Sequence, residues 1–586
     1  MPDAVQLRYS VLLPGSTGSY PVVIQYTGYD SGTIGGSAYQ EGNTWLSEDV
    51  DMGLLNSGYA VMGVSIRGTG CSTGKFNFYS SDWGTDGAQA VQWAAQQPWS
   101  TGQIGMYDWS WGGISQLFVA SERPANLVCI APGEVTTDVL RDVAGPGGIL
   151  NPLFPTLWWA TILDSWTYNL QNAESDGDTE GVANAMHNYA VGQATSPPTD
   201  IHPYEDAWWV QRDLRAATAN IDIPVLSLEL WQDEEVGPRG GYYQELLNPH
   251  TTWYVGSNGE HDTYVNDQFR AQLLTPFFDH YLKGINNGFQ KSNRVQLWME
   301  TSAAGAPMSS DAQLELAEPA WVIELPSLPI PVTPVTLHLS GAGTLCTTSA
   351  PPTASGVTYE VLPGPTVNDG LVGSITGGEG GPPSEYTWEL DVLVPGTYAA
   401  FTTGPLVQDL TLSGSASLNL WISSAAPDTD IQATITEVRP DGQELYVQRG
   451  WLNVSQRAID PQLSNKLRPV HLQTLASVAL LEPGIPVEAR VEINKFTHTF
   501  RTGSALRLII DGPSNTGDWA FASEAGTTNT VWCDADHPSA LVVGLLSTQQ
   551  APVGYPAPNT LIGQPCRSNT INVPIEPTVA WLETLP

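Results

Sequence analysis

Up to about residue 135, the chain alternates short apolar runs with stretches in which apolar residues recur at helical spacing. Apolar runs without polar interruptions are typical of strands that are buried on both faces of a parallel sheet. Between the second and third runs, TDGAQAVQWAAQQ is rich in helix formers, begins with the candidate caps Thr85 and Asp86, and stops at Pro98. The pattern predicts βαβ units, with strands at residues 22–25, 61–66, 104–107 and 127–130.

An aromatic-rich stretch of helical character interrupts this alternation at about residues 136–219. We interpret it as a cap inserted into the sheet domain, because the strand pattern resumes after it. The resumed pattern gives strands at residues 224–230, 252–255 and 294–300, with a helical FFDHYLKG segment before the last of them. The first domain is therefore predicted to comprise residues 1–135 and 220–320.

From about residue 320 the composition changes, with more Pro, Gly, Thr and Ser. Short alternating runs such as VTLHLSG, LNLWIS and ALRLIID recur between turn residues, with almost no helical pattern. Many short strands joined by tight turns are typical of a β-sandwich or jelly roll. We therefore predict an α/β domain with a helical cap, followed by an all-β jelly-roll domain at residues 325–586, with the Pro-rich stretch at 324–336 as the linker.

The formal net charge is −38, from 60 acidic and 22 basic residues spread along the chain. Such a field repels phosphate backbones and anionic lipids, so neither nucleic acid nor a membrane is an expected partner. The N-terminal MPDAVQLRYS has no basic region followed by an apolar stretch, which favours a cytoplasmic over a secreted protein, although a leader trimmed from a longer precursor stays an alternative. The sequence does not give the oligomeric state, and a homodimer is one alternative.

The five cysteines are widely spaced and form no CxxC pair, which argues against a zinc ribbon or a disulfide scaffold. A single bridge between Cys533 and Cys566 stays an alternative. The chain has no HExxH motif, and its segment GGSAYQEGN is glycine-rich without the spacing of a phosphate-binding loop. The sequence therefore predicts neither a metal nor a cofactor.

The segment GMYDWSWGGI joins a predicted strand to a predicted helix through a turn of small residues. Ile114 and Leu117 fall at helical spacing after this turn. A serine at such a turn lies on a tight backbone bend that presents its hydroxyl beside the helix N-terminus, which is the arrangement of a nucleophile elbow. Asp108 replaces the first glycine of the usual GxSxG pattern. The segment nevertheless predicts Ser110 as a nucleophile.

A serine hydroxyl is a weak nucleophile until a histidine, itself oriented by a carboxylate, removes its proton. With a nucleophile elbow, the acid and then the histidine follow the serine at the ends of later strands. Asp233 follows the apolar run VLSLELW, and His261 lies in GSNGEHDTY after the run TTWYV. The competing candidates fit less well, since His250 precedes its strand and His280 lies in a helical pattern. The predicted triad is Ser110, Asp233 and His261.

These blocks together resemble the bacterial cocaine esterases, within the larger α/β-hydrolase group that includes X-Pro dipeptidyl peptidases and α-amino-acid ester hydrolases. The resemblance covers nearly the whole chain. Its blocks are QYTGYD, GYAVMGVSIRGTG, the elbow GMYDWSWGG, AGPGGIL, LWQD, the histidine loop, FFDHYLKG, FTTGPLVQDLTLSGSASLNLWISSAAPDTD and VRPDG. So many ordered blocks are more specific than any single motif.

The resemblance implies a serine hydrolase that cleaves small-molecule carboxylic esters through an acyl-enzyme, with Ser110, Asp233 and His261 as its triad. It further implies an oxyanion hole that combines the backbone N–H of Trp111 with the hydroxyl of Tyr29. The histidine loop GSNGEH departs from the Gly-Pro-Trp-Ser-His form usual in the family.

The tryptophans of the predicted cap have two interpretations. In the family, the cap and the β domain wall the cleft, so Trp158, Trp159 and Trp166 would form a pocket for an aromatic or apolar acyl group. They would equally well form the core of the cap. The sequence leaves both interpretations open.

Glu234 and Glu235 support an alternative substrate. In the α-amino-acid ester hydrolases, a pair of carboxylates close behind the triad acid binds the substrate's ammonium group, and LWQDEEV resembles that arrangement. An α-amino-acid ester hydrolase or an amide hydrolase similar to X-Pro dipeptidyl peptidase therefore stays open, with Asp142 as the nearest candidate for a third carboxylate. Asp108 keeps one more alternative open, because a charged residue in the elbow is compatible with an inactive scaffold that acts as a binding protein.

Overall fold

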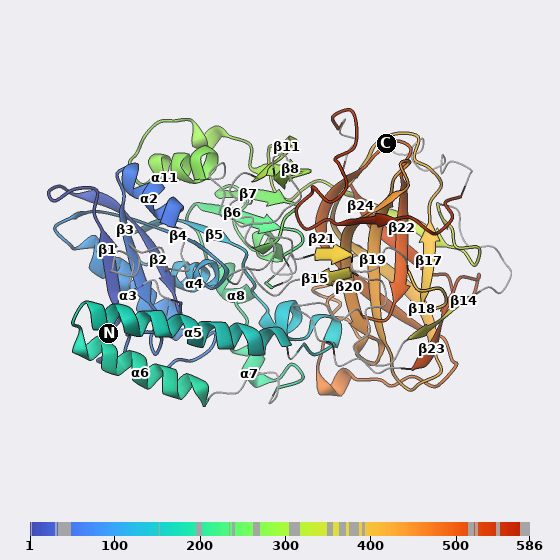
Figure 1. Cartoon of the computed structure of the whole chain (residues 1–586), viewed down its shortest axis with the longest axis horizontal. Coiled ribbons are helices and arrows are strands. Elements are labelled where there is room, and N and C mark those ends of the chain that lie inside the picture. Colours follow the sequence, from blue (N-terminus) through green and yellow to red (C-terminus); the bar gives the residue numbers. More distant parts are fainter. Residues whose placement is uncertain are drawn as a thin grey trace.

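The computed structural model describes an α/β domain, a helical cap and an all-β domain, arranged along the long axis of the molecule (Figure 1). It describes all residues except 2, 30–31, 33–47, 152, 195–201, 234, 237–240, 262–269, 304–316, 348–355, 362–370, 374–385, 389–392, 514–520, 522–525, 547–550 and 575–586.

A mixed nine-stranded sheet forms the centre of the α/β domain, in the order β1-β3-β2-β4-β5-β6-β7-β8-β11. The strands β2 to β8 run parallel, and the edge strands β1 and β11 run antiparallel to their neighbours. The predicted strands are confirmed, and β1 and β11 are additional edge strands. The bounds are β1 Tyr9–Leu12, β2 Tyr20–Thr27, β3 Ala60–Ser65, β4 Ser100–Trp109, β5 Leu127–Gly133, β6 Val225–Leu230, β7 Thr252–Ser257, β8 Val295–Met299 and β11 Trp321–Leu325.

Helices cover both faces of this sheet, which explains why its central strands are apolar throughout. The helices α3 (Asp82–Ala95) and α4 (Ser110–Ser121) pack against each other on one face. The helices α2 (Glu48–Asn56) and α11 (Thr275–Tyr281) cover the other face, above the sheet in Figure 1, where Phe278 is fully buried. The predicted crossover helix is therefore confirmed as α3, and the FFDHYLKG helix as the end of α11.

The predicted cap is helical, as expected. Its two long helices, α5 (Leu153–Ser175) and α6 (Thr179–Gln193), pack side by side below α3 in Figure 1. The Asp178 carboxylate caps α6 by accepting a hydrogen bond from the N–H of Gly181. The shorter helices are α7 Ala207–Val210 and α8 Arg215–Thr218, and the short helical turns along the chain are η2 Leu140–Ala144, η3 Pro146–Gly148, η5 Gly241–Glu245, η7 Arg270–Leu274, η8 Phe289–Lys291, η9 Val454–Gln456 and η10 Leu475–Ser477.

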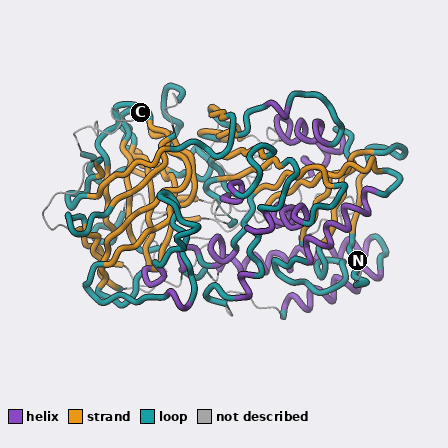
Figure 2. Tube along the Cα trace, turned by 180° about the vertical axis from the view of Figure 1, so that it is seen from behind, coloured by secondary structure: helices purple, strands orange, loops and turns teal. Residues whose placement is uncertain are grey.

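The C-terminal domain is a sandwich of two antiparallel sheets around one apolar core. Figure 2 shows its strands gathered on one side of the molecule and the long helices on the other. One sheet has the order β13-β12-β24-β18-β23-β14, with β21 also paired to β18, and the other has the order β17-β22-β19-β20-β25. The bounds are β12 Thr333–Leu339, β13 Leu345–Cys346, β14 Gly356–Val361, β17 Tyr398–Thr402, β18 Leu410–Ser424, β19 Asp430–Val438, β20 Gln443–Asn453, β21 Val487–Phe500, β22 Ala505–Asp511, β23 Thr527–Trp532, β24 Ala540–Leu545 and β25 Cys566–Ser568.

Two short strand pairs stand outside these sheets. They are β9 Ser302–Ala303 with β10 Ala317–Glu318, and β15 Leu371–Gly373 with β16 Tyr386–Trp388.

The linker between the domains is shorter than the Pro-rich stretch predicts. The first residues of that stretch complete β11, in which Ile323 is buried and pairs with Leu297 of β8. Its last residues begin β12 of the sandwich. The packing of the WVIEL run against β8 therefore overrides the proline content that indicated a linker.

The Cys533–Cys566 bridge is not formed, because all five cysteines are thiols in the structure. Cys533 follows β23 in one sheet of the sandwich, whereas Cys566 begins β25 in the other sheet. Cys533 packs in the core of the sandwich, whereas Cys566 packs in a separate cluster with Leu445 and Leu561. Within the described part of the chain, no helix is both long and apolar enough to cross a bilayer.

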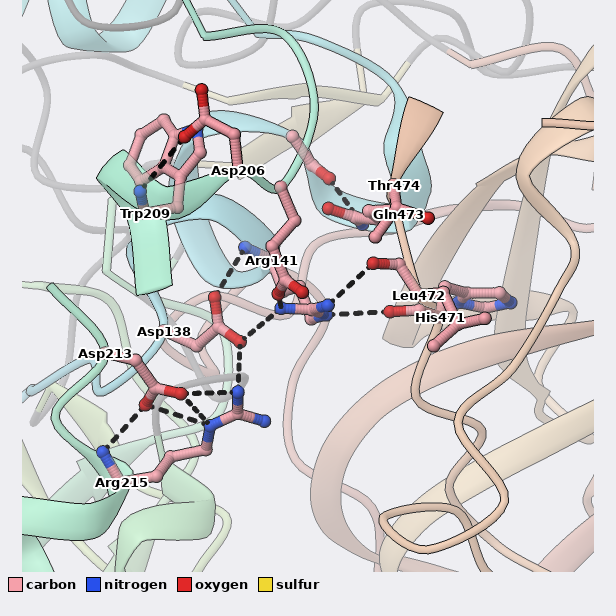
Figure 3. A network of polar contacts seen from close by, with 12 residues as sticks. Asp138, Arg141, Asp206, Trp209, Asp213, Arg215, His471, Leu472, Gln473 and Thr474 are labelled. Carbon is pink, nitrogen blue, oxygen red and sulfur yellow. Dashed lines mark hydrogen bonds and ion pairs between the residues drawn. The ribbon is translucent and has the colours of Figure 1, made fainter. Parts of the chain in front are cut away.

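The half-buried guanidinium of Arg141 joins the cap to the β domain (Figure 3). Arg141 of η2 donates to the carbonyl oxygens of His471 (2.7 Å) and Leu472 (2.9 Å), and it forms an ion pair with Asp138 at 2.8 Å. The amide of Gln473 donates in return to a backbone carbonyl of the cap at 2.9 Å. A planar guanidinium whose N–H groups are hydrogen-bonded on several sides holds the cap and the β domain in one relative position.

Candidate active site

Ser110 lies at the junction between a strand and a helix. The strand β4 ends at Trp109 and α4 begins at Ser110, whose φ of 55° is in the left-handed region. Non-glycine residues adopt this conformation only where the surroundings impose it, and functional turns are where such strain is found. The backbone N–H groups of the first turn of α4 have no partner inside the helix, so they are available beside the serine hydroxyl.

The elbow accommodates Asp108 because the residue on the far side of the serine is glycine. A Cβ atom at Gly112 would lie 1.9 Å from Oδ2 of Asp108, and a Cβ at Gly113 would lie 2.3 Å from the carbonyl oxygen of Gly133. Oδ1 of Asp108 accepts a hydrogen bond from the N–H of Trp109 at 2.9 Å. The charged residue therefore fills the space that Gly112 leaves, and the turn keeps its left-handed serine.

Asp233 and His261 meet at the ends of β6 and β7. Nδ1 of His261 lies 2.8 Å from Oδ2 of Asp233. Oδ1 of Asp233 accepts from the backbone N–H groups of Glu235 (2.9 Å) and Val236 (3.1 Å). Burial opposes the ionisation of Asp233, but the charge of His261 and its hydrogen bond lower the pKa of the carboxyl below its usual value. The arrangement is a buried carboxylate that fixes one ring nitrogen of a histidine.

The histidine loop that departs from the family form is held by the neighbouring loop and by the β domain. The side-chain oxygen of Gln232 accepts a hydrogen bond from the backbone N–H of Gly259 at 3.1 Å. The backbone N–H of Gln232 donates to the carbonyl oxygen of Gly259 at 3.0 Å. The amide of Asn258 donates to the carbonyl oxygens of Thr301 (2.9 Å) and Ile562 (3.1 Å). These contacts place the loop although its sequence is unusual.

Tyr29 lies beside Ser110. Its hydroxyl accepts a hydrogen bond from the indole N–H of Trp158 at 3.0 Å, and the Ser110 hydroxyl is among the groups that act on its pKa. Burial raises the pKa of Tyr29 above its usual value, so its hydroxyl keeps a proton to donate. The preceding Gly28 has no room for a side chain, because a Cβ there would lie 2.0 Å from the ring of Trp111.

A cavity of about 370 Å³ opens at Ser110. Trp158, Trp159 and Trp166 all line it, so the cap tryptophans contribute to a pocket as well as to the cap core. Trp166 is nearly fully buried, and its indole N–H donates to the carbonyl of Gly28 at 2.8 Å. Further aromatic walls come from residues that the sequence analysis did not place at the site, namely Phe76, Phe78, Tyr79, Trp208 and Trp209.

Acidic residues take different positions around this cavity. Glu235 lines it, and Oε2 of Glu235 lies 3.6 Å from Nε2 of His261. Asp142 is buried outside the cavity lining and accepts hydrogen bonds from the Thr136 hydroxyl and the Asp138 N–H. Glu234 lies outside the described residues.

The competing histidines lie elsewhere. His250 is exposed in the turn before β7. His280 lies on α11, where its Nδ1 is 3.1 Å from the carbonyl oxygen of Ile285. Neither lines the cavity at Ser110.

Comparison with known proteins covers both domains. Residues 3–262 match the X-Pro dipeptidyl-peptidase family (S15 family), and residues 287–542 match the X-Pro dipeptidyl-peptidase C-terminal non-catalytic domain. The cocaine esterase of Rhodococcus sp. is 24% identical over 608 aligned positions, which cover 93% of this chain and 97% of the esterase. The chain therefore pairs a match to the S15 family with a match to its C-terminal non-catalytic domain, and it is similar to the cocaine esterase over nearly the whole length of both chains.

Solved structures share the fold of this chain. A CocE/NonD family hydrolase from Staphylococcus aureus superposes with a TM-score of 0.71 at 20% identity, covering 93% of this chain and 92% of that one. An α-amino-acid ester hydrolase superposes with a TM-score of 0.68 at 16% identity, covering 93% of this chain and 95% of that one. The matches indicate that the chain is a serine hydrolase that acts on esters or related substrates. The expected fold class and family are confirmed.

Proposed function

We propose that this protein is a serine carboxylesterase that works through an acyl-enzyme on Ser110. The observation that carries the proposal is the position of Ser110, on a strained elbow that opens into an aromatic cavity. The buried pair of Asp233 and His261 at the ends of two later strands supports it. Together these supply a nucleophile, a base and an orienting acid.

The reaction begins when His261 takes the proton of Ser110 as the serine oxygen attacks the ester carbonyl. The hydroxyl of Tyr29 and the N–H of Trp111 then donate to the oxyanion of the tetrahedral intermediate. Asp233 keeps Nδ1 of His261 protonated and stabilises the imidazolium. His261 next protonates the leaving alcohol, after which it activates a water molecule that releases the acyl group.

Removal of the Tyr29 hydroxyl tests the oxyanion hole. Tyr29→Phe should lower kcat by about 10²-fold with little change in KM, because the lost hydrogen bond strengthens only as the oxyanion forms. Steady-state kinetics on one ester would measure both constants. Tyr9→Phe, at an exposed tyrosine of β1, is the matched control and should retain wild-type kinetics. An unchanged kcat in Tyr29→Phe would remove Tyr29 from the mechanism.

The cavity supports an aromatic or apolar acyl group as the preferred substrate. Its volume of about 370 Å³ is within the range of small-molecule sites, which are concave and mostly apolar. The walls near Ser110 include Trp111 and Trp158, whose ring centroids are 5.3 Å apart. Aromatic side chains bind an aromatic ring by offset or edge contacts and bury much of its apolar area.

One observation favours the second candidate function, an α-amino-acid ester hydrolase. The Glu235 carboxylate lines the same cavity, close to the histidine, where it could bind an ammonium group next to the ester carbonyl. The expected third carboxylate does not support this candidate, because Asp142 binds groups within the cap. The carboxylesterase therefore leads.

Two matched esters of the same alcohol, phenylacetyl and phenylglycyl, distinguish the candidates. We expect the neutral phenylacetyl ester to have the equal or higher kcat/KM, with Ser110→Ala as the blank. A kcat/KM more than about tenfold higher for the ammonium-bearing phenylglycyl ester, roughly 1.4 kcal/mol, would favour the second candidate. Glu235→Gln should then abolish this preference. Hydrolysis of neither ester above the blank would contradict the carboxylesterase proposal.

A further inference from the structure

Glu134 is a buried acid behind the proposed triad. It directly follows β5, has a φ of 45°, and is only 2% exposed. Its backbone N–H donates to the carbonyl of Leu228 at 3.4 Å, which places it next to β6, the strand that leads to Asp233. The left-handed conformation turns the chain at the carboxyl edge of the sheet, where the proposed catalytic residues gather.

The charged and polar side chains in the surroundings of Glu134 come from four elements. Glu229 of β6 lies 2.7 Å from the ammonium of Lys495, which reaches in from β21 of the β domain. The hydroxyl of Tyr254 on β7 also donates to Glu229, at 2.7 Å. Tyr243 of η5 donates to Ser227 at 2.6 Å. The half-buried ammonium of Lys495 is therefore paired with Glu229.

Glu134 has a different neighbour, the carboxyl of Asp233, and no donor among the described residues is hydrogen-bonded to either buried carboxyl oxygen of Glu134. None of the ion pairs among the described residues includes Glu134, whereas Asp233 has His261 and two backbone N–H groups. Two buried carboxyls in contact do not both ionise, and the proton stays on the one without compensating partners. Burial, followed by the charge of Asp233, raises the pKa of Glu134 well above its usual value.

We propose that Glu134 is a positioning residue that stays protonated and donates a hydrogen bond to the Asp233 carboxylate. With this bond, Asp233 is held by His261 on one side, by backbone N–H groups on another, and by Glu134 on a third. The carboxylate that orients His261 then cannot rotate away during the reaction. The inference rests on the proposed function, because it gives Glu134 a role in the same triad.

A pair of variants separates hydrogen bonding from packing. Glu134→Gln keeps a donor in the same place and cannot ionise, whereas Glu134→Leu removes the donor at similar volume. We expect the Gln variant to keep kcat within about threefold of wild type, and the Leu variant to lose about tenfold in kcat with KM little changed. The measurement is kcat and kcat/KM for the phenylacetyl ester as a function of pH.

The acid limb of the pH profile is the more specific readout. Without the Glu134 hydrogen bond, the charge of Asp233 is less dispersed and favours imidazolium more strongly, so the pKa of His261 rises. The acid limb of kcat/KM should therefore move up by about half a pH unit in Glu134→Leu and stay in place in Glu134→Gln. A role in packing alone would not shift this limb.

The pH dependence of thermal unfolding gives a second readout of the protonation of Glu134. A glutamate that stays protonated when folded takes up a proton on folding at neutral pH, so the wild type loses stability as the pH rises above the unfolded value of about 4.3. Glu134→Gln avoids this uptake, and its Tm should exceed that of the wild type more at about pH 7.5 than at about pH 4.5.

Fluorophosphonate labelling of the wild type distinguishes a failure of the inference about Glu134 from a failure of the proposed function. Suppose that the wild type is labelled at Ser110. The inference about Glu134 alone is then overturned if Glu134→Leu keeps the kcat and the acid limb of the wild type, or if Glu134→Gln lowers kcat as much as Glu134→Leu does. If the wild type is not labelled, the proposed function fails, and the role of Glu134 fails with it.

Discussion

Ser110→Ala is expected to lower kcat/KM for the phenylacetyl ester by at least about 10⁴-fold, because no other group can form the acyl-enzyme. Hydrolysis measured at high enzyme concentration would set the size of the loss. The fold should persist, since alanine removes only a hydroxyl and occupies the same backbone conformation.

Ser121→Ala provides the matched control for this variant. Ser121 ends α4, and its hydroxyl donates to the carbonyl of Phe118 at 2.7 Å, away from the cavity. This variant should keep wild-type kinetics. A Ser110→Ala rate within tenfold of wild type would contradict the assignment of the nucleophile.

Asp233→Asn should lower kcat by about 10³–10⁴-fold while the geometry of the site is largely kept. The asparagine side chain can donate to Nδ1 of His261, which favours the tautomer with its proton on Nε2 and leaves no base for Ser110. The loss should appear in kcat more than in KM, because the charge of the imidazolium develops only in the transition state.

Asp222→Asn is the control for the loss of a carboxylate. Asp222 precedes β6 at the opposite end from Asp233, and its side chain is 62% exposed beside Arg123. Its replacement should leave kcat unchanged, since exposed ion pairs contribute little. If Asp233→Asn cost less than tenfold, another residue would have to orient His261.

The local patterns of the chain predicted the elements that carry the proposed triad. The strand–turn–helix at Ser110 is contiguous in sequence, so its apolar run, small residues and helical spacing can be recognised together. Asp233 and His261 each follow a buried run, and parallel strands bring their ends to one edge of a sheet. The resemblance to a known family added Tyr29, which no local pattern distinguishes from a structural tyrosine.

Contacts between distant segments could not be predicted in the same way. Phe76 and Phe78 reach the cavity from the connection between β3 and α3, and nothing in their neighbourhood indicates which way their side chains point. Glu134 lies in a segment whose small and threonine residues give no sign that its carboxyl is buried. The sequence alone does not show that the Asp108 side chain fits the elbow, because it occupies the space that a side chain at Gly112 would take.

The most direct test of the account is the site of covalent labelling by a fluorophosphonate, mapped by peptide mass spectrometry. The account predicts one adduct on the wild type, on the peptide that contains Ser110, and no adduct on Ser110→Ala. An adduct on a different residue, or a wild type that hydrolyses the phenylacetyl ester while Ser110 stays unmodified, would contradict the central claim.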